Sequence, residues 1–114
     1  MEIWINNVKN FSKKEETIVI RGNSISLIEG NSCYEKVLSR DVNFISDVEY
    51  QLSKIMFGWK EEYIGGRTID GEKYHITVDV NHKKKKYKIQ NKFPENWEEF
   101  ITLKERIIEG SFYD

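Results

Sequence analysis

Three side chains in the second half of the chain have the chemistry to bind a metal ion or to share a proton, namely His75, Asp79 and His82. Imidazole and carboxylate groups are common metal ligands in proteins. His75 and Asp79 occupy polar positions of an alternating segment, and residues four apart on a strand are separated by about 13 Å. The two side chains cannot chelate one ion without help from elsewhere. We therefore interpret them as part of a solvated strand face and expect no metal and no cofactor.

Cys33 is the single cysteine, and it could act as a nucleophile only with a nearby base and a lowered pKa. No local signature of such a base accompanies it, and one cysteine cannot form an internal disulfide. We interpret Cys33 as a small buried thiol in a short strand and expect no catalytic residue. A small enzyme or ligand-binding protein, with a site assembled from residues distant in the sequence, stays an alternative.

Acidic residues come in three groups. Two are adjacent pairs, Glu15-Glu16 and Glu61-Glu62. Paired catalytic carboxylates sit in a cleft that separates their pKa values, whereas adjacent residues on a strand or helix point in different directions, so these pairs are interpreted as solvating. The third group lies on a predicted helix and could form an acidic patch for a basic protein partner. Its members are Glu95, Glu98 and Glu99.

The strongest charge run consists of four consecutive lysines, followed by an aromatic residue and a fifth lysine. Basic residues interleaved with aromatic ones can bind phosphates and stack bases. We place the run in the turn of a hairpin, where lysines also keep a sheet edge from pairing with other chains. Nucleic-acid binding is therefore an alternative function, and its candidate residues are Lys83, Lys84, Lys85 and Lys86.

Aromatic residues are abundant, with three Trp, six Tyr and six Phe among 114 residues. Trp and Tyr are enriched in binding hot spots. Packing in the core is favoured for each aromatic residue taken singly, yet their number exceeds what one small core requires. A protein-binding surface is therefore expected to include Trp59, Tyr63 and Trp97, together with the acidic patch of the predicted helix.

Composition and charge narrow the classes of function. The 18 Lys and Arg nearly balance the 19 Asp and Glu, for a net charge of −1. This balance argues against a strongly basic nucleic-acid binder and against a strongly acidic DNA mimic. No segment has the pattern of a signal peptide, and no run approaches the ~20 apolar residues of a membrane span. We expect a cytoplasmic protein without a membrane partner, although a mature secreted protein would have the same pattern.

Apolar residues at every second position predict strands, and a period near 3.6 predicts helices. In the first third we expect strands over Ile3–Ile5, Thr17–Arg21, Ser24–Ile28 and Cys33–Leu38, with a polar connection over Asn6–Glu16. Later, a strand over Tyr74–Val80, a basic turn over Asn81–Lys86 and a short strand over Tyr87–Ile89 are expected to form a hairpin.

Two amphipathic helices are predicted. The first carries an apolar stripe from Phe44 to Trp59, with Asp41 or Asn43 as its N-cap and Gly58 as its end. The second has Pro94 in its first turn and Gly110 as its C-terminal cap. One α+β domain over residues 1–114 is therefore expected, with the order β-β-β-β-α-β-β-α. Both helices would pack on a mainly antiparallel sheet of about six strands.

The C-terminal part of the chain resembles known sequences. Asp70-Gly71, the strand over Tyr74–Val80 and the motif Phe93-Pro94-x-Asn96-Trp97 with Phe100 are similar to the C-terminal half of small uncharacterised α+β proteins of low-GC bacteria. The size and layout are also similar to those of immunity proteins of bacterial polymorphic toxin systems, which neutralise a toxin. The small size, the surplus of aromatic residues, the separated charge patches and the lack of a catalytic constellation favour a non-catalytic protein-binding domain. The likeness to immunity proteins implies an immunity-like or antitoxin-like role, with another protein as the partner. A homodimer is a further option.

Overall fold

The structure is a computed structural model, and it describes residues 1–9, 14–30, 34–66 and 71–110. Seven strands and two helices are defined within these residues. In chain order they are β1 (Glu2–Lys9), β2 (Lys14–Arg21), β3 (Ser24–Glu29), β4 (Lys36–Ser39), α1 (Val42–Met56), β5 (Glu62–Ile64), β6 (Glu72–Val80), β7 (Lys83–Gln90) and α2 (Trp97–Gly110). The predicted order of elements is confirmed, with the short β5 as an additional strand.

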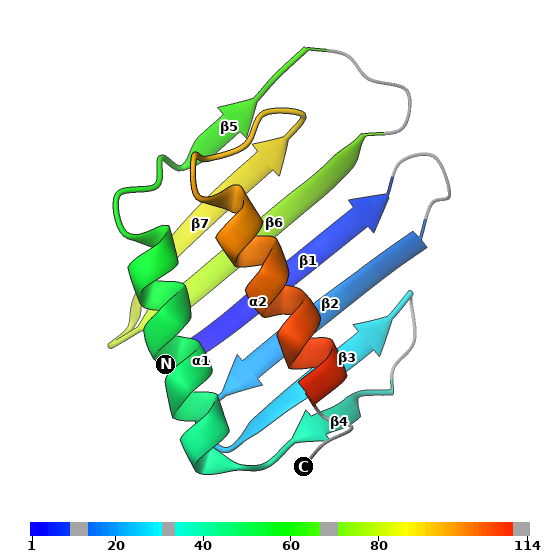
Figure 1. Ribbon diagram of the computed structural model, residues 1–114, viewed down its shortest axis with the longest axis vertical. Helices are drawn as coiled ribbons and strands as arrows, with labels where there is room; N and C mark the ends of the chain where they lie inside the picture. Colours follow the sequence, from blue (N-terminus) through cyan, green and yellow to red (C-terminus); the bar gives the residue numbers. More distant parts are fainter. Residues whose placement is uncertain (10–13, 31–33, 67–70, 111–114) are drawn as a thin grey trace.

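The strands form one sheet in the spatial order β4-β3-β2-β1-β6-β7-β5. Neighbouring strands pair antiparallel throughout, except that β5 and β7 are parallel. The first strand of the chain therefore lies at the centre of the sheet, between β2 and β6 (Figure 1). The predicted α+β class with a mainly antiparallel sheet is confirmed.

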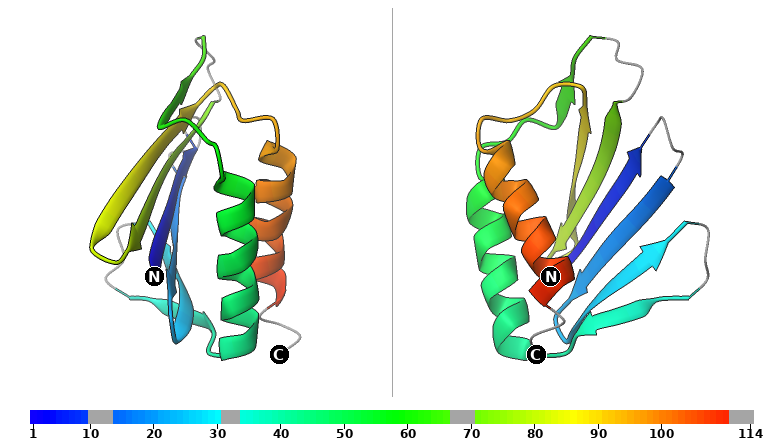
Figure 2. Two further views of the ribbon diagram at one scale, coloured as in Figure 1. Left: turned by 90° about the vertical axis from the view of Figure 1, so that its left-hand side faces the viewer. Right: turned by 45° about the vertical axis from the view of Figure 1, so that its right-hand side comes forward.

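Both helices pack on the same face of the sheet, as the two side views show (Figure 2). The buried stripe of α1 consists of residues three or four apart, which is the spacing of one helix face. The stripe meets inward-facing isoleucines of β1, β2 and β6 in a single core, and the main contributors are Ile45, Val48, Leu52, Ile3, Ile5, Ile18, Ile20 and Ile76. Neither of the two described helices lies on the opposite face, and we call it the open face.

Capping determines where α1 begins and ends. The Asp41 carboxylate accepts hydrogen bonds from the backbone N–H groups of Asn43 and Phe44, at 3.0 and 3.3 Å, which satisfies two otherwise unpaired donors. The helix ends at Met56, and the chain then turns at Gly58, whose φ of 83° suits glycine. Of the two predicted N-caps, Asp41 and Asn43, the structure has Asp41, and the predicted stop near Gly58 is confirmed.

The predicted polar connection over Asn6–Glu16 was wrong at both ends. β1 continues to Lys9, and β2 already begins at Lys14. The polar side chains are compatible with strands because their backbones pair with neighbouring strands, and the amide of Asn6 donates on the open face to Glu15 and Thr17. Alternation of apolar residues alone missed these strand ends.

Three other boundaries also differ from the prediction. The turn between β6 and β7 consists only of Asn81 and His82, both with positive φ, so the lysines lie on β7 and not in a turn. A two-residue turn of this kind matches the twist of a hairpin. Pro94 precedes α2, which begins at Trp97, and Gly110 is the last residue of that helix. Cys33 lies outside the described residues, and the neighbouring strand, β4, begins at Lys36.

Candidate functional site

The most exposed large apolar side chain at the C-terminal end of α1 is that of Phe57. It follows the last helical residue in an extended conformation, and 89 % of it is exposed. Tyr50, seven positions earlier, is 63 % exposed, and residues seven apart lie on the same side of a helix. Both residues lie off the buried stripe, so α1 has a second apolar side that faces away from the core.

Two adjoining cavities make this region a continuous surface. A cavity of about 370 Å³ lies between the end of α1 and the β6–β7 hairpin, and its walls include Met1, Phe57, Val80 and Lys85. A second cavity of about 300 Å³ is lined by Tyr50, Ser53, Lys54 and Phe57. Because Phe57 borders both, we call the combined region the Phe57 surface.

The charge around the Phe57 surface has one sign. Among the described residues that line the two cavities, the charged side chains are Lys54 and Lys85. The Lys54 ammonium lies 5.2 Å from the centroid of the Tyr50 ring, in a cation–π contact. The surface is therefore apolar with a basic rim. Its chemistry suits a ligand or partner segment in which an apolar side chain is flanked by negatively charged ones.

The lysines predicted to bind nucleic acid all lie on β7 and are exposed. Side chains alternate between the faces of a strand, so Lys84 and Lys86 lie on the open face, opposite Asp79 and Thr77 of β6. Lys83 and Lys85 lie on the face that carries the helices. Among the described residues, the ion pairs involve Lys9, Arg21 and Lys104, and none of the β7 lysines.

Two of the three aromatic residues predicted to bind protein, Trp59 and Trp97, are half-buried in an aromatic cluster. The Trp59 and Trp97 ring centroids are 6.0 Å apart, and Phe100 packs against both. The Trp59 indole N–H donates to the Asn96 side chain at 2.7 Å, and the Asn96 amide donates to the Ile55 carbonyl. These contacts join the end of α1 to the start of α2. Only Trp59 also lines the Phe57 surface.

Tyr63 belongs to the same region but has a local role. It is half-buried, and its hydroxyl accepts a hydrogen bond of 2.9 Å from the backbone N–H of Lys60. This contact fixes the chain just before β5. Tyr63 and Trp97 do not line the Phe57 surface, so the sequence prediction and this surface share Trp59 alone.

The predicted acidic patch lies at the start of α2, where Glu95, Glu98 and Glu99 are all exposed. Glu98 and Glu99 are in the first turn, where negative charge favours the helix dipole. They also line a groove of about 550 Å³ between the helices, together with Lys54 and Arg106. The groove therefore has mixed charge. The favourable interaction of Glu98 and Glu99 with the helix dipole explains their position without a binding partner.

The histidines and acidic residues considered for metal binding are not brought together. His75 faces Asn6 and Lys88 on neighbouring strands, and His82 lies in the hairpin turn. Within residues 1–9, 14–30, 34–66 and 71–110, no group of three or more His, Cys, Asp or Glu could hold a metal ion. Cys33 lies outside those ranges.

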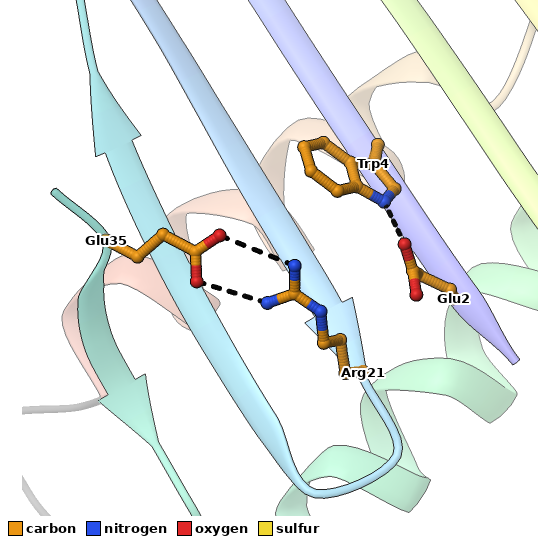
Figure 3. A network of polar contacts seen from close by, with 4 residues as sticks. All are labelled: Glu2, Trp4, Arg21 and Glu35. Carbon is orange, nitrogen blue, oxygen red and sulfur yellow. Dashed lines mark hydrogen bonds and ion pairs between the residues drawn. The ribbon is translucent and has the colours of Figure 1, made fainter. Parts of the chain in front are cut away.

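The β1–β3 half of the open face is covered by its own side chains, which the sequence did not reveal. Arg21 donates two hydrogen bonds to Glu35, at 3.1 and 3.4 Å, and its guanidinium lies 5.6 Å from the centroid of the Trp4 ring. The Trp4 indole N–H in turn donates to Glu2 (Figure 3). Val19, on this same face, is fully buried. The hydrogen bond to Glu35 is the main cause that raises the pKa of Arg21.

A polar cluster also lies beside the core under α2. The Lys104 ammonium is 2.9 Å from a Glu16 oxygen and 3.2 Å from the Tyr74 hydroxyl, and burial raises the pKa of Tyr74. Nearby, Asn7 borders a cavity of about 550 Å³. The Asn7 amide is buried and has no hydrogen-bond partner among the described residues. Because its polar atoms are covered, they cannot reach a molecule in that cavity in this conformation.

Comparison with protein-family models, with curated proteins and with solved structures finds no match to this chain. Among the described residues, neither helix has the length and apolar character that a membrane crossing requires.

Proposed function

We propose that this chain is a non-catalytic protein-binding domain and that the Phe57 surface is its binding site. The observation that carries the proposal is the 89 % exposure of Phe57 between two apolar cavities. Large exposed apolar patches with polar rims mark interaction sites, and aromatic anchors supply much of the binding energy there. Full burial of one phenylalanine is worth about 1.5–3 kcal/mol.

The rim of the Phe57 surface favours an acidic partner over a second copy of this chain. In a symmetric dimer formed by this surface, the charged lining residues of both copies would be Lys54 and Lys85, so like charges would repel across the contact. An acidic protein would instead be attracted. In its specific form the proposal is an immunity-like or antitoxin-like protein that neutralises this partner, which the small α+β layout supports.

The test is capture of partners by the tagged protein from its host, with wild type, Phe57→Ser and Val42→Ser compared. The tag belongs at the C-terminus because Met1 lines the Phe57 surface. Val42 is a matched control, since it is 58 % exposed on the same helix at the opposite end. We expect one stoichiometric protein with wild type and Val42→Ser, and its loss with Phe57→Ser.

Retention of that protein by Phe57→Ser would refute the binding site, and capture of no stoichiometric protein would count against the function. The captured protein would then be assayed with and without this chain, because a neutralising role predicts inhibition at an equimolar ratio. Light scattering of the purified wild-type protein measures whether it forms a dimer. We expect a monomer, because the like charges of the rim would repel.

Single-stranded nucleic-acid binding is the second candidate, favoured by the arrangement of Lys84, Lys86 and Lys88. These exposed lysines recur at every second position of β7, roughly 6.6 Å apart, which is similar to the spacing of phosphates along an extended strand. This function predicts binding that weakens steeply with salt and does not depend on Phe57. Unchanged retention of nucleic acid after replacing Lys83, Lys84, Lys85 and Lys86 by Glu would exclude it.

A further inference from the structure

More than half of the outer edge of β7 is not paired with another strand of the described residues. β6 pairs with β7 along its whole length, from Lys83 to Gln90, whereas β5 covers only Lys88–Gln90 on the other side. Figure 1 shows β5 beside the end of β7 at one margin of the sheet. Within the part of the chain that the structure describes, the stretch Lys83–Tyr87 is therefore a free edge, about 17 Å long at ~3.3 Å per residue.

The pairing pattern shows which backbone groups point outward on this edge. The Asn81-His82 turn closes the hairpin with Val80 opposite Lys83, and in an antiparallel pair every second residue bonds inward. The even-numbered residues of β7 bond outward, as the 2.8 Å hydrogen bond from the Lys88 N–H to the Glu61 carbonyl shows. No backbone hydrogen bond joins Lys84 or Lys86 to a described residue on this side.

We propose that an acidic extended segment of the partner pairs with Lys83–Tyr87 as an added strand. This inference rests on the proposed protein-binding function and specifies the binding mode and the partner's chemistry. Added strands gain affinity from backbone hydrogen bonds and specificity from alternate side chains. The outward N–H and C=O groups of Lys84 and Lys86 are available for these backbone hydrogen bonds.

Charge complementarity identifies the added strand as acidic. Lysines on an edge strand repel most other strands and so prevent unspecific pairing. An acidic segment removes that repulsion, because carboxylates on its open-face side would lie beside Lys84 and Lys86. The same lysines therefore reject neutral or basic strands and admit an acidic one, which is discrimination by repulsion as well as attraction.

The Phe57 surface determines which side chains of the added strand are favoured on the helix-bearing face. Lys85 projects on the helix-bearing face and lines that surface together with Val80 and Phe57. Side chains of the added strand that point to this face would enter the apolar cavity. The segment is therefore expected to alternate acidic residues, over the open face, with apolar residues, over the Phe57 surface.

The probe is a blocked peptide of about eight residues in which Glu and Val alternate, titrated into ¹⁵N-labelled protein. We expect the amide signals of Lys84 and Lys86 to shift and to gain protection from hydrogen exchange. One control peptide has Lys in place of Glu, and another is N-methylated on alternate residues so that it lacks the backbone donors. The N-methylated peptide is expected to bind at least about tenfold more weakly, which is the loss of one to two hydrogen bonds. The Lys peptide is expected to bind at least about tenfold more weakly because its charges repel those of Lys84 and Lys86.

Lys86→Pro tests the backbone directly. Proline removes an outward N–H while the inward ladder to β6 stays intact, and it is tolerated on an edge strand. Lys86→Gln is the matched control, because it removes the charge and keeps the N–H. Peptide binding is expected to fall about tenfold more in Lys86→Pro than in Lys86→Gln. If Lys86→Pro does not fold, the double variant Lys84→Glu, Lys86→Glu tests the charge, with loss of peptide binding expected.

These results distinguish failure of strand addition from failure of the proposed protein-binding function. Equal binding of the N-methylated peptide, or shifts at Phe57 without protection of Lys84 and Lys86, would overturn strand addition and leave the Phe57 surface in place. No binding of the Glu-Val peptide would also overturn it, whatever the capture experiment shows. Displacement of the peptide by an oligothymidylate of the same length would assign the edge to nucleic acid instead.

Discussion

Replacement of Asn7 by leucine is expected to stabilise the protein. The Asn7 side chain is 1 % exposed, and its nitrogen and oxygen atoms have no hydrogen-bond partner among the described residues. A buried polar group without a partner costs roughly 1–3 kcal/mol. Leucine has a similar branched shape and needs no partner. We expect the free energy of unfolding to rise by about 1–3 kcal/mol, which corresponds to a rise in Tm of roughly 4–8 °C per kcal/mol.

The assay is urea unfolding followed by tryptophan fluorescence, with Asn6→Leu as the matched control. Asn6 is the preceding residue of β1, and its amide donates to Glu15 at 2.8 Å and to Thr17 at 3.0 Å. Asn6→Leu removes these bonds and is expected to lower the free energy of unfolding by about 0.5–1.5 kcal/mol. A loss of stability in Asn7→Leu, comparable to that of the control, would refute the argument that the Asn7 amide is unpaired.

Two further predictions concern groups beside the core. Burial raises the pKa of Tyr74 above its ordinary value of 10.0, so the unfolded chain loses the phenolic proton first and stability should fall as the pH rises above about 10. Urea titrations at about pH 9 and pH 11 should show a smaller fall for Tyr74→Phe than for wild type, and equal falls would contradict the shift. Asn96→Ala leaves the Trp59 indole and the Ile55 carbonyl without their partner, so the free energy of unfolding should drop by about 1–3 kcal/mol. A drop below about 0.5 kcal/mol in the same urea assay would show that water replaces the amide.

Periodicity predicted the elements whose apolar residues face one side. In both the stripe of α1 and the alternation of β6, the apolar positions are the ones that face the core. Both elements lie where the sequence predicted them. The polar ends of β1 and β2 lack that signal, because their strand geometry comes from pairing with other strands. Asn7, for example, pairs with Glu16 on one side and Tyr74 on the other. No local pattern encodes those partners.

The candidate site was only partly predictable for a related reason. The lysine run is visible in the sequence, but its free edge depends on how far β5 extends, which is a property of the assembled sheet. Tyr50 and Phe57 carried a usable signal, since they are large apolar residues off the stripe of an amphipathic helix. Trp59 and Trp97 stay predicted binding residues, but hot-spot statistics do not show which aromatic residues pack against each other, as these two rings do.

The central position of β1 has a consequence for the growing polypeptide. β1 is made before the other strands of the sheet, yet its partner β6 lies roughly 70 residues later. One side of β1 therefore has no native neighbour until β6 has been synthesised. Pairing of β1 with β2 and of β2 with β3 is local and can form early. The nascent protein therefore passes through a stage with an apolar, unpaired strand edge, and this is the interval in which wrong association with other chains is most favoured.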